Sequence, residues 1–185
     1  MEKIGKQVGG EKMTQELIDL KKSILEGRYA DALAIVDELE GMSKKAILRQ
    51  LKSFLRILLI HLIKNQVEQR LTNSWVASIR NAIREIKEVN IKDNKISYYI
   101  NLGEWENLIE EEVIEDAIAD ASDEVMNGSY NQFQLAEMVD RNQIIQTALK
   151  FLVLTYSYSA KELPAVVAEN LTQLIGGEDW KTGRQ

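Results

Sequence analysis

Residues 44–71 limit the possible folds of this chain more than any other stretch, because their apolar pattern changes midway. In the first half, at about 100° per residue, apolar and basic residues occupy opposite faces of a helix. After Arg56 the polar face ends, and the positions up to Ile63 are apolar in all directions, with His61 among them. A helix that is apolar on all sides has to be surrounded by other elements. The sequence therefore predicts a long helix near 44–71 whose second half is the centre of a bundle.

The remainder of the chain also favours helix. It contains one proline, Pro164, and no run of alternating apolar and polar residues long enough to indicate a strand. Glycines stand where periodic segments stop, as at helix C-termini: Gly27, Gly41, Gly103, Gly128 and Gly176-Gly177. We expect one all-α domain over residues 1–185, with loose ends at 1–12 and 178–185. Its six or seven main helices are expected at 15–26, 29–40, 44–71, 75–89, 105–126, 141–156 and 164–175, with a shorter helix near 131–138.

Side chains that accept hydrogen bonds are expected to cap several of these helices. The predicted caps are Ser43, Ser74 or Asn73, Asp140 with Gln143, and Ser159 with Glu162 ahead of a helix that starts at Pro164. In the segment 105–126 the apolar stripe shifts by nearly half a turn at Glu110-Glu111-Glu112. Either the helix breaks there or its halves pack against different partners. The predicted core is Leu51, Phe54, Leu58, Leu59, Leu62, Ile79, Ile83, Ile114, Ile118, Ile145, Leu149 and Leu152.

Charge is distributed unevenly along the chain. Residues 41–95 hold twelve Lys or Arg against four acids, whereas residues 96–140 hold twelve acids and no Lys or Arg. The first segment carries a basic stripe, Lys45, Arg49, Lys52 and Arg56, and the second an acidic stripe, Glu112, Asp116, Asp120 and Asp123. We expect the two segments to face each other, or their images in a second subunit. A nucleic-acid surface is the weaker reading, because the net charge of −6 repels phosphate.

Residues that carry catalytic chemistry are scarce. The chain has no cysteine, a single histidine and no glycine-rich phosphate loop, so a catalytic triad, a thiolate site or a multi-histidine metal site is not expected. No metal or cofactor is predicted. His61 is read as a hydrogen-bonded core residue and Trp75 as a packing residue. If the chain is an enzyme instead, its site is expected in a pocket formed by His61, Trp75, Arg80 and an acid.

A family resemblance runs from residue 27 to about 86. It is carried by "DELEGM" before a basic helix, by "LLIHLIK" with His61 and Lys64, and by "SW…IR" at Ser74, Trp75, Ile79 and Arg80. These motifs resemble the bacterial domain-of-unknown-function family numbered twenty-nine, and "AIADASDE" at 117–124 resembles it more weakly. The resemblance implies a helical bundle over 14–126 and no specific activity. Members often end in Phe-Pro and Cys-Pro-Tyr segments, whereas this chain continues as a helical extension over 129–175.

These observations favour a non-enzymatic protein-interaction or assembly module, with a protein partner or a second copy as the binding partner. The alternatives are a small-molecule enzyme with a pocket near His61 and Trp75, or a nucleic-acid-binding helical protein. The candidate pocket or interaction residues are His61, Lys64, Trp75 and Arg80. The most apolar stretch is about ten residues long, half of what a membrane span needs, and residues 1–13 lack the apolar core of a signal peptide. We therefore expect a cytoplasmic protein with no membrane association.

Overall fold

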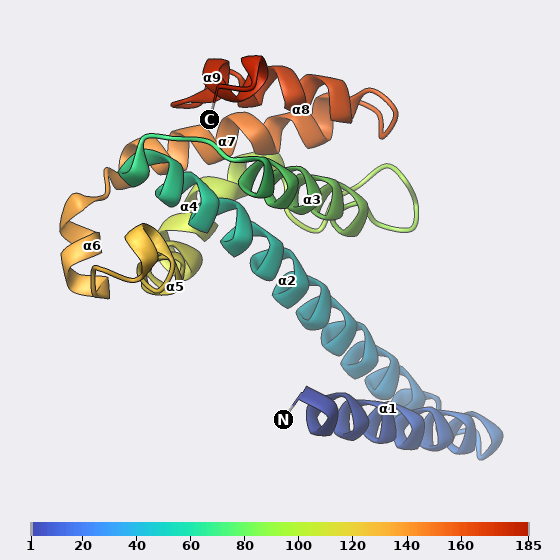
Figure 1. The fold of residues 1–185 in the computed structure, drawn as a ribbon. Helices are drawn as coiled ribbons and strands as arrows, with labels where there is room; N and C mark the ends of the chain where they lie inside the picture. Colours follow the sequence, from blue (N-terminus) through green and yellow to red (C-terminus); the bar gives the residue numbers. More distant parts are fainter. Residues whose placement is uncertain (1, 185) are drawn as a thin grey trace. The chain divides into compact units, whose positions relative to one another are not determined.

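The computed structural model describes the backbone of residues 2–184 and the side chains of residues 10–184. Within that range the chain is helical and has no strand beyond an isolated bridge between Ile91 and Tyr98, which confirms the all-α prediction. Two compact units are present, Met1–Leu48 and Arg49–Gln185. The longer helices, labelled in Figure 1, are α1 (Glu2–Leu25), α2 (Tyr29–Glu68), α3 (Asn73–Asn90), α5 (Ile114–Ser122), α7 (Arg141–Ser157) and α8 (Leu163–Leu171). No helix in the described range has the length and apolar character needed to cross a membrane.

The largest departure from the sequence prediction is at Gly41. The expected helices at 29–40 and 44–71 are one continuous helix, α2, so Gly41 is not a helix end and Ser43 is not a cap. A β-carbon at Gly41 would meet no atom within 4 Å. A helix-interior glycine costs about 1 kcal/mol relative to alanine, which one position in a helix of 40 residues tolerates.

The ends of the chain that were expected to be loose are helical over most of their length. Helix α1 already begins at Glu2, and a short helix, α9 (Gly177–Thr182), lies close to the other end. Residues 1 and 185 lie outside the described residues. The close approach at Gly177 explains why glycine stands at the start of α9, since a β-carbon there would collide with the carbonyl oxygens of Leu171 and Thr172.

The core of the second unit is built around the last part of α2, as predicted. Leu51, Leu58, Leu59 and Leu62 are buried, together with the predicted positions of α3, α5 and α7: Ile79, Ile83, Ile114, Ile118, Ile145 and Leu152. Helices α3, α7 and α8 pack against one another, and α5 packs on α6 (Gln132–Met138). Phe54 and Leu149 were predicted in the core but are only half-buried, because each lies at the edge of its helix's buried face.

The shift of the apolar stripe at Glu110-Glu111-Glu112 has a clear structural cause. The segment expected as one helix over 105–126 contains α4 (Trp105–Leu108), a π-helical turn (Ile109–Val113) and α5. The N–H of Ile114 donates to the carbonyl of Ile109, five residues back. The extra residue in this turn rotates α5 about the helix axis, so that the apolar residues of both halves reach the same core. Trp105, Ile109, Val113, Ile114 and Ala117 are all buried.

Helix caps were predicted with mixed success. Asp140 caps α7 by accepting from the N–H of Gln143, as expected. The Ser159 and Glu162 side chains and backbones bond reciprocally, and α8 begins at Leu163 with proline in its first turn. At the start of α3 the prediction was one or two residues late, because Thr72 is the cap and accepts from the N–H of Trp75. The last predicted helix also ends earlier, at Leu171 instead of residue 175.

Candidate functional site

Cations of α2 and acids of the segment around α5 lie against each other. Lys52 pairs with Glu112, the guanidinium of Arg56 lies 3.3 Å from the Asp120 carboxylate, and the Lys64 ammonium lies 2.5 Å from Glu124. Two of the four residues of each predicted stripe therefore pair within one chain. Lys45, Arg49, Asp116 and Asp123 form no ion pair among residues 10–184. Most of these groups are partly exposed, so each pair contributes at most about 1 kcal/mol.

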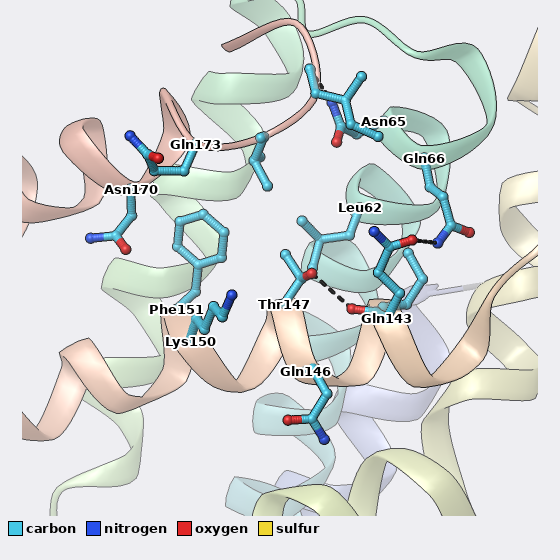
Figure 2. A pocket seen from close by; sticks show the side chains of 13 residues that line it. Leu62, Asn65, Gln66, Gln143, Gln146, Thr147, Lys150, Phe151, Asn170 and Gln173 are labelled. Atoms are coloured by element: carbon cyan, nitrogen blue, oxygen red, sulfur yellow. Dashed lines mark hydrogen bonds between the residues drawn. The ribbon is translucent and has the colours of Figure 1, made fainter.

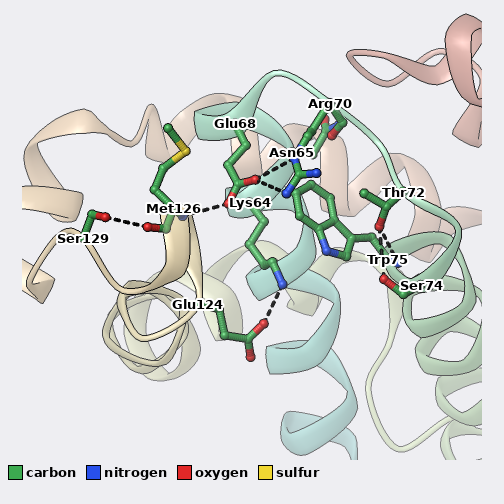
Figure 3. Close-up of polar contacts among 10 residues, drawn as sticks. All are labelled: Lys64, Asn65, Glu68, Arg70, Thr72, Ser74, Trp75, Glu124, Met126 and Ser129. Carbon is green, nitrogen blue, oxygen red and sulfur yellow. Dashed lines mark hydrogen bonds and ion pairs between the residues drawn. The ribbon is translucent and has the colours of Figure 1, made fainter. Parts of the chain in front are cut away.

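A cluster of polar contacts surrounds Trp75 in the second unit (Figure 3). The buried indole ring has two cations over it: the Lys64 ammonium at 4.8 Å and the Arg70 guanidinium at 5.0 Å from the ring centre. Such contacts are electrostatic and contribute about 0.5–2 kcal/mol each. The pairing of Lys64 with Glu124 then connects the indole to the turn after α5.

Glu68, at the end of α2, completes this cluster. Its carboxylate accepts from Arg70 at 2.7 Å and from the backbone N–H of Met126 at 2.8 Å, as Figure 3 shows. Met126 and Asn127 have φ values of 47° and 56°, in the left-handed region that non-glycine residues rarely adopt. The bond from Glu68 therefore helps to hold a strained turn. Because these polar groups bond to one another, the cluster joins the end of α2 to the start of α3 and to the turn after α5.

His61 is half-buried, whereas the sequence led us to expect a buried core histidine. Its Nδ1 lies 2.8 Å from the carbonyl oxygen of Ile57, so this nitrogen carries the proton and donates. Burial lowers the pKa of the imidazole, and the neighbouring Lys64 charge lowers it further, against the opposing effect of the bond to Ile57. His61 is therefore neutral in the folded protein at pH 7.

The structure does not assemble the four candidate pocket residues in one place. Lys64 and Trp75 are in contact and have an acid, Glu124, beside them. Arg80 is exposed on α3 and lines a pocket between α3 and α8 that neither Lys64 nor Trp75 lines. Five positions at about 100° place it roughly 140° around the helix from Trp75. This separation was readable from the sequence.

A first pocket, of about 270 Å³, lies between the end of α2, α7 and the end of α8 (Figure 2). Six carboxamide side chains line it: Asn65, Gln66, Gln143, Gln146, Asn170 and Gln173. Several of them are already used by the fold. Gln66 bonds both the N–H and the carbonyl of Asp140 and donates to Gln143, while Asn65 donates to the carbonyls of Arg70 and Ile175. The side-chain oxygen of Gln66 therefore accepts from the backbone N–H of Asp140. In a capping box the side chain of Gln143 would have made this bond.

A second pocket, of about 430 Å³, lies between α3 and α8. Three cations of α3 line one wall: Arg80, Arg84 and Lys87. The opposite wall is apolar and consists of Leu163, Pro164 and Val167, with Ala160 beside them. This pocket was not predicted from the sequence, although the spacing i, i+4 and i+7 of the three cations places them on one helix face.

The described part of the chain holds no cluster of side chains suited to binding a metal ion. Among residues 10–184, no three His, Asp or Glu side chains are arranged as metal ligands. Two carboxyl groups have a lowered pKa, Glu115 through its bond with Arg141 and Glu162 through the backbone and hydroxyl of Ser159. The ion pair with Arg141 explains the lowered pKa of Glu115, and the hydrogen bonds with Ser159 at the start of α8 explain that of Glu162.

Comparison with known proteins identifies a family. A family model described as "Domain of unknown function DUF29" matches residues 13–147. The match starts before and ends after the residues that carried the resemblance in sequence, and it includes α2, α3, α5 and the first part of α7. Searches of curated proteins and of solved structures gave no significant match.

Proposed function

We propose that this chain, which belongs to the DUF29 family of domains of unknown function, is a non-enzymatic assembly module that pairs with a second copy of itself. The pairing surface is the N-terminal hairpin, defined here as α1 together with residues 29–48 of α2. The proposal rests on one observation: among residues 10–48 none of the large apolar side chains is fully buried, and half of them are exposed.

Among residues 10–48, the only buried side chains are those of Ser23 and Ala32, both small. The exposed fractions of Leu25, Tyr29 and Leu33 are 77%, 67% and 65%. Four more large apolar residues of α1 are about half-exposed: Met13, Leu17, Ile18 and Ile24. A helix pair that buries so little of its apolar surface lacks a core of its own, and stable helical units pack their apolar stripes against further helices.

A second copy is the partner that the charges of the hairpin favour. Residues 1–48 hold nine acids and eight bases, so two such units hardly repel each other. Several of these charges are paired within the hairpin, for example Lys12 with Glu38 and Arg28 with Asp31. Apolar contact then remains as the main driving force. Full burial of one Leu or Ile is worth about 1.5–3 kcal/mol, and a two-fold pair buries each such residue twice.

The catalytic and nucleic-acid alternatives have less support. His61 and the groups around Trp75 are bonded to protein partners, and neither of the two pockets between helices is lined by them. For nucleic acid, Lys52, Arg56 and Lys64 already have carboxylate partners, which reduces the positive field that phosphates require.

Sedimentation velocity over a wide concentration range tests the proposal. We expect a dimer for the parent and a monomer for the double variant Leu17→Lys, Ile24→Lys, because each charge would be placed in the apolar contact. Ile96→Lys is the matched control: it changes an exposed isoleucine of the second unit and should leave the dimer intact. Circular dichroism verifies helix content. A parent that stays monomeric throughout, or a control that dissociates equally, would refute pairing through the hairpin.

A further inference from the structure

The pocket between α3 and α8 combines charge on one side with apolar surface on the other. Arg80 and Arg84 are one helical turn apart, and Lys87 comes nearly one turn later. Glu88 is the only acid among the lining residues, so three cations are opposed by one carboxylate. Leu163, Pro164 and Val167 of α8 form the other wall, and Ile83 of α3 also lines the pocket. A volume of about 430 Å³ lies within the range of small-molecule sites, about 300–1,000 Å³.

The three cations differ in the hydrogen bonds and ion pairs that they form within the protein. Lys87 donates to the carbonyl of Thr155 at 2.7 Å and is half-buried. Arg84 donates to the amide oxygen of Asn81 at 2.5 Å and lies 3.5 Å from Glu85. Arg80 has no hydrogen bond or ion pair with any side chain between residues 10 and 184.

Arg80 is also the member of its sequence motif that packing does not explain. Trp75 and Ile79 are buried in the core, and Ser74 bonds the capping side chain of Thr72. Arg80 takes part in none of these contacts, and its side chain lines the pocket instead. Its guanidinium presents several donors in a rigid fork, which matches the two oxygens of a carboxylate better than a lysine ammonium does.

The geometry points to a binding site for a small carboxylic acid with an apolar body. The carboxylate would bind to Arg80 and Arg84, and the apolar body would lie on Leu163, Pro164 and Val167. A neutral apolar molecule would leave the guanidinium groups without an anion, and an amine would be repelled by three positive charges. This inference does not depend on the assembly proposed above.

Three probes of equal chain length separate these ligand classes: octanoate, 1-octanol and octylamine. Each is titrated into the ¹⁵N-labelled full chain while backbone amide shifts are recorded. We expect saturable shifts for octanoate at residues 77–88 and 160–167, and at least tenfold weaker binding of the other two, since a charge-assisted hydrogen bond is worth about a factor of ten or more. Equal binding of all three probes, or no shifts in these segments, would overturn the proposal.

Variants then assign the roles within the pocket. Arg80→Gln should weaken octanoate binding about tenfold, whereas the matched control Arg49→Gln, which removes an exposed and unpaired arginine of α2, should change it less than twofold. Ala77→Phe, at an exposed lining position, should block the apolar part and abolish binding. If Arg80→Gln and Arg49→Gln weaken binding equally, the effect is one of overall charge, and Arg80 is not the carboxylate ligand.

Discussion

The ammonium group of Lys64 lies 4.8 Å from the centre of the Trp75 ring, with the Glu124 carboxylate 2.5 Å away on its other side. Lys64→Met keeps most of the apolar stem and removes the charge, so it should lower the free energy of unfolding by about 1–2 kcal/mol. A double-mutant cycle with Trp75→Leu, followed by urea unfolding, should give a coupling energy of about 1 kcal/mol. Simple additivity of the two changes would show that the contact with the ring contributes nothing.

The ion pairs between α2 and the segment around α5 predict a salt-dependent stability. The double variant Lys52→Glu, Arg56→Glu should unfold more easily than the parent by about 1–2 kcal/mol at low salt. This difference should shrink near 1 M salt, where the Debye length is about 3 Å. The complementary change Glu112→Lys, Asp120→Lys in the same chain should restore stability.

Lys45→Glu, Arg49→Glu is the matched control for this prediction, because neither residue has an ion-pair partner among residues 10–184. We expect it to have less than half the effect of the other double variant at low salt. If both double variants melt like the parent at low salt, the facing stripes do not interact.

Leu58 is fully buried in α2, and its neighbour Ile57 lies on the exposed side of the same helix. Leu58→Ala should therefore cost about 2–5 kcal/mol through lost burial and a cavity. Ile57→Ala should cost less, about 1–2 kcal/mol, since 36% of that residue is already exposed. Chemical denaturation of the two variants in parallel measures the difference, and equal costs would contradict the orientation of α2.

Two glycine substitutions test whether α2 is continuous. Gly41→Ala should raise stability by about 0.5–1 kcal/mol, because the site is helical and has open space for a β-carbon. Gly177→Ala should lower stability, because its β-carbon would collide with backbone oxygens. Thermal unfolding followed by circular dichroism gives both values. A destabilised Gly41→Ala would indicate that the helix ends at this glycine.

His61 predicts how stability depends on pH. Because burial lowers its pKa in the folded protein below the ordinary value of 6.5, the unfolded chain takes up the proton first as the pH falls. Stability should therefore decrease between pH 7 and pH 5.5, and His61→Gln should remove that part of the decrease. The single histidine also allows an unambiguous NMR titration of its ring proton. A pKa at or above 6.5 would contradict the prediction.

The sequence was informative where a residue's role depends on its own helix. Periodicity identified the buried half of α2. The shifted stripe marked the place of the π turn between Ile109 and Val113, although a helix break or two different packing partners had been expected there. It was less informative where several weak preferences compete. Gly41 carries a helix-ending signal of only about 1 kcal/mol, and the rest of α2 overrides it. The cap of α3 was misplaced because Thr72, Asn73 and Ser74 are all good capping residues.

The candidate site was harder to predict because it depends on contacts between helices. Lys64 and Trp75 were identified together, but their partner Arg70 was not, since no periodic pattern connects the end of α2 with the following loop. The pocket beside Arg80 needs α8, which lies about eighty residues further along the chain. Helical spacing of Arg80, Arg84 and Lys87 indicates a charged face, whereas the apolar wall opposite comes only from tertiary packing.

The π turn also affects how this chain should be aligned with other members of its family. It holds one residue more than an α-helical turn would need, so a relative with a regular helix here should show a one-residue gap between Ile109 and Val113. If the gap is left out of the alignment, every acidic residue after it would be compared with a residue about 100° away around the helix. Comparisons of Asp120 and Glu124 across the family therefore require that the gap be placed before Ile114, where the hydrogen-bond pattern returns to that of an α-helix.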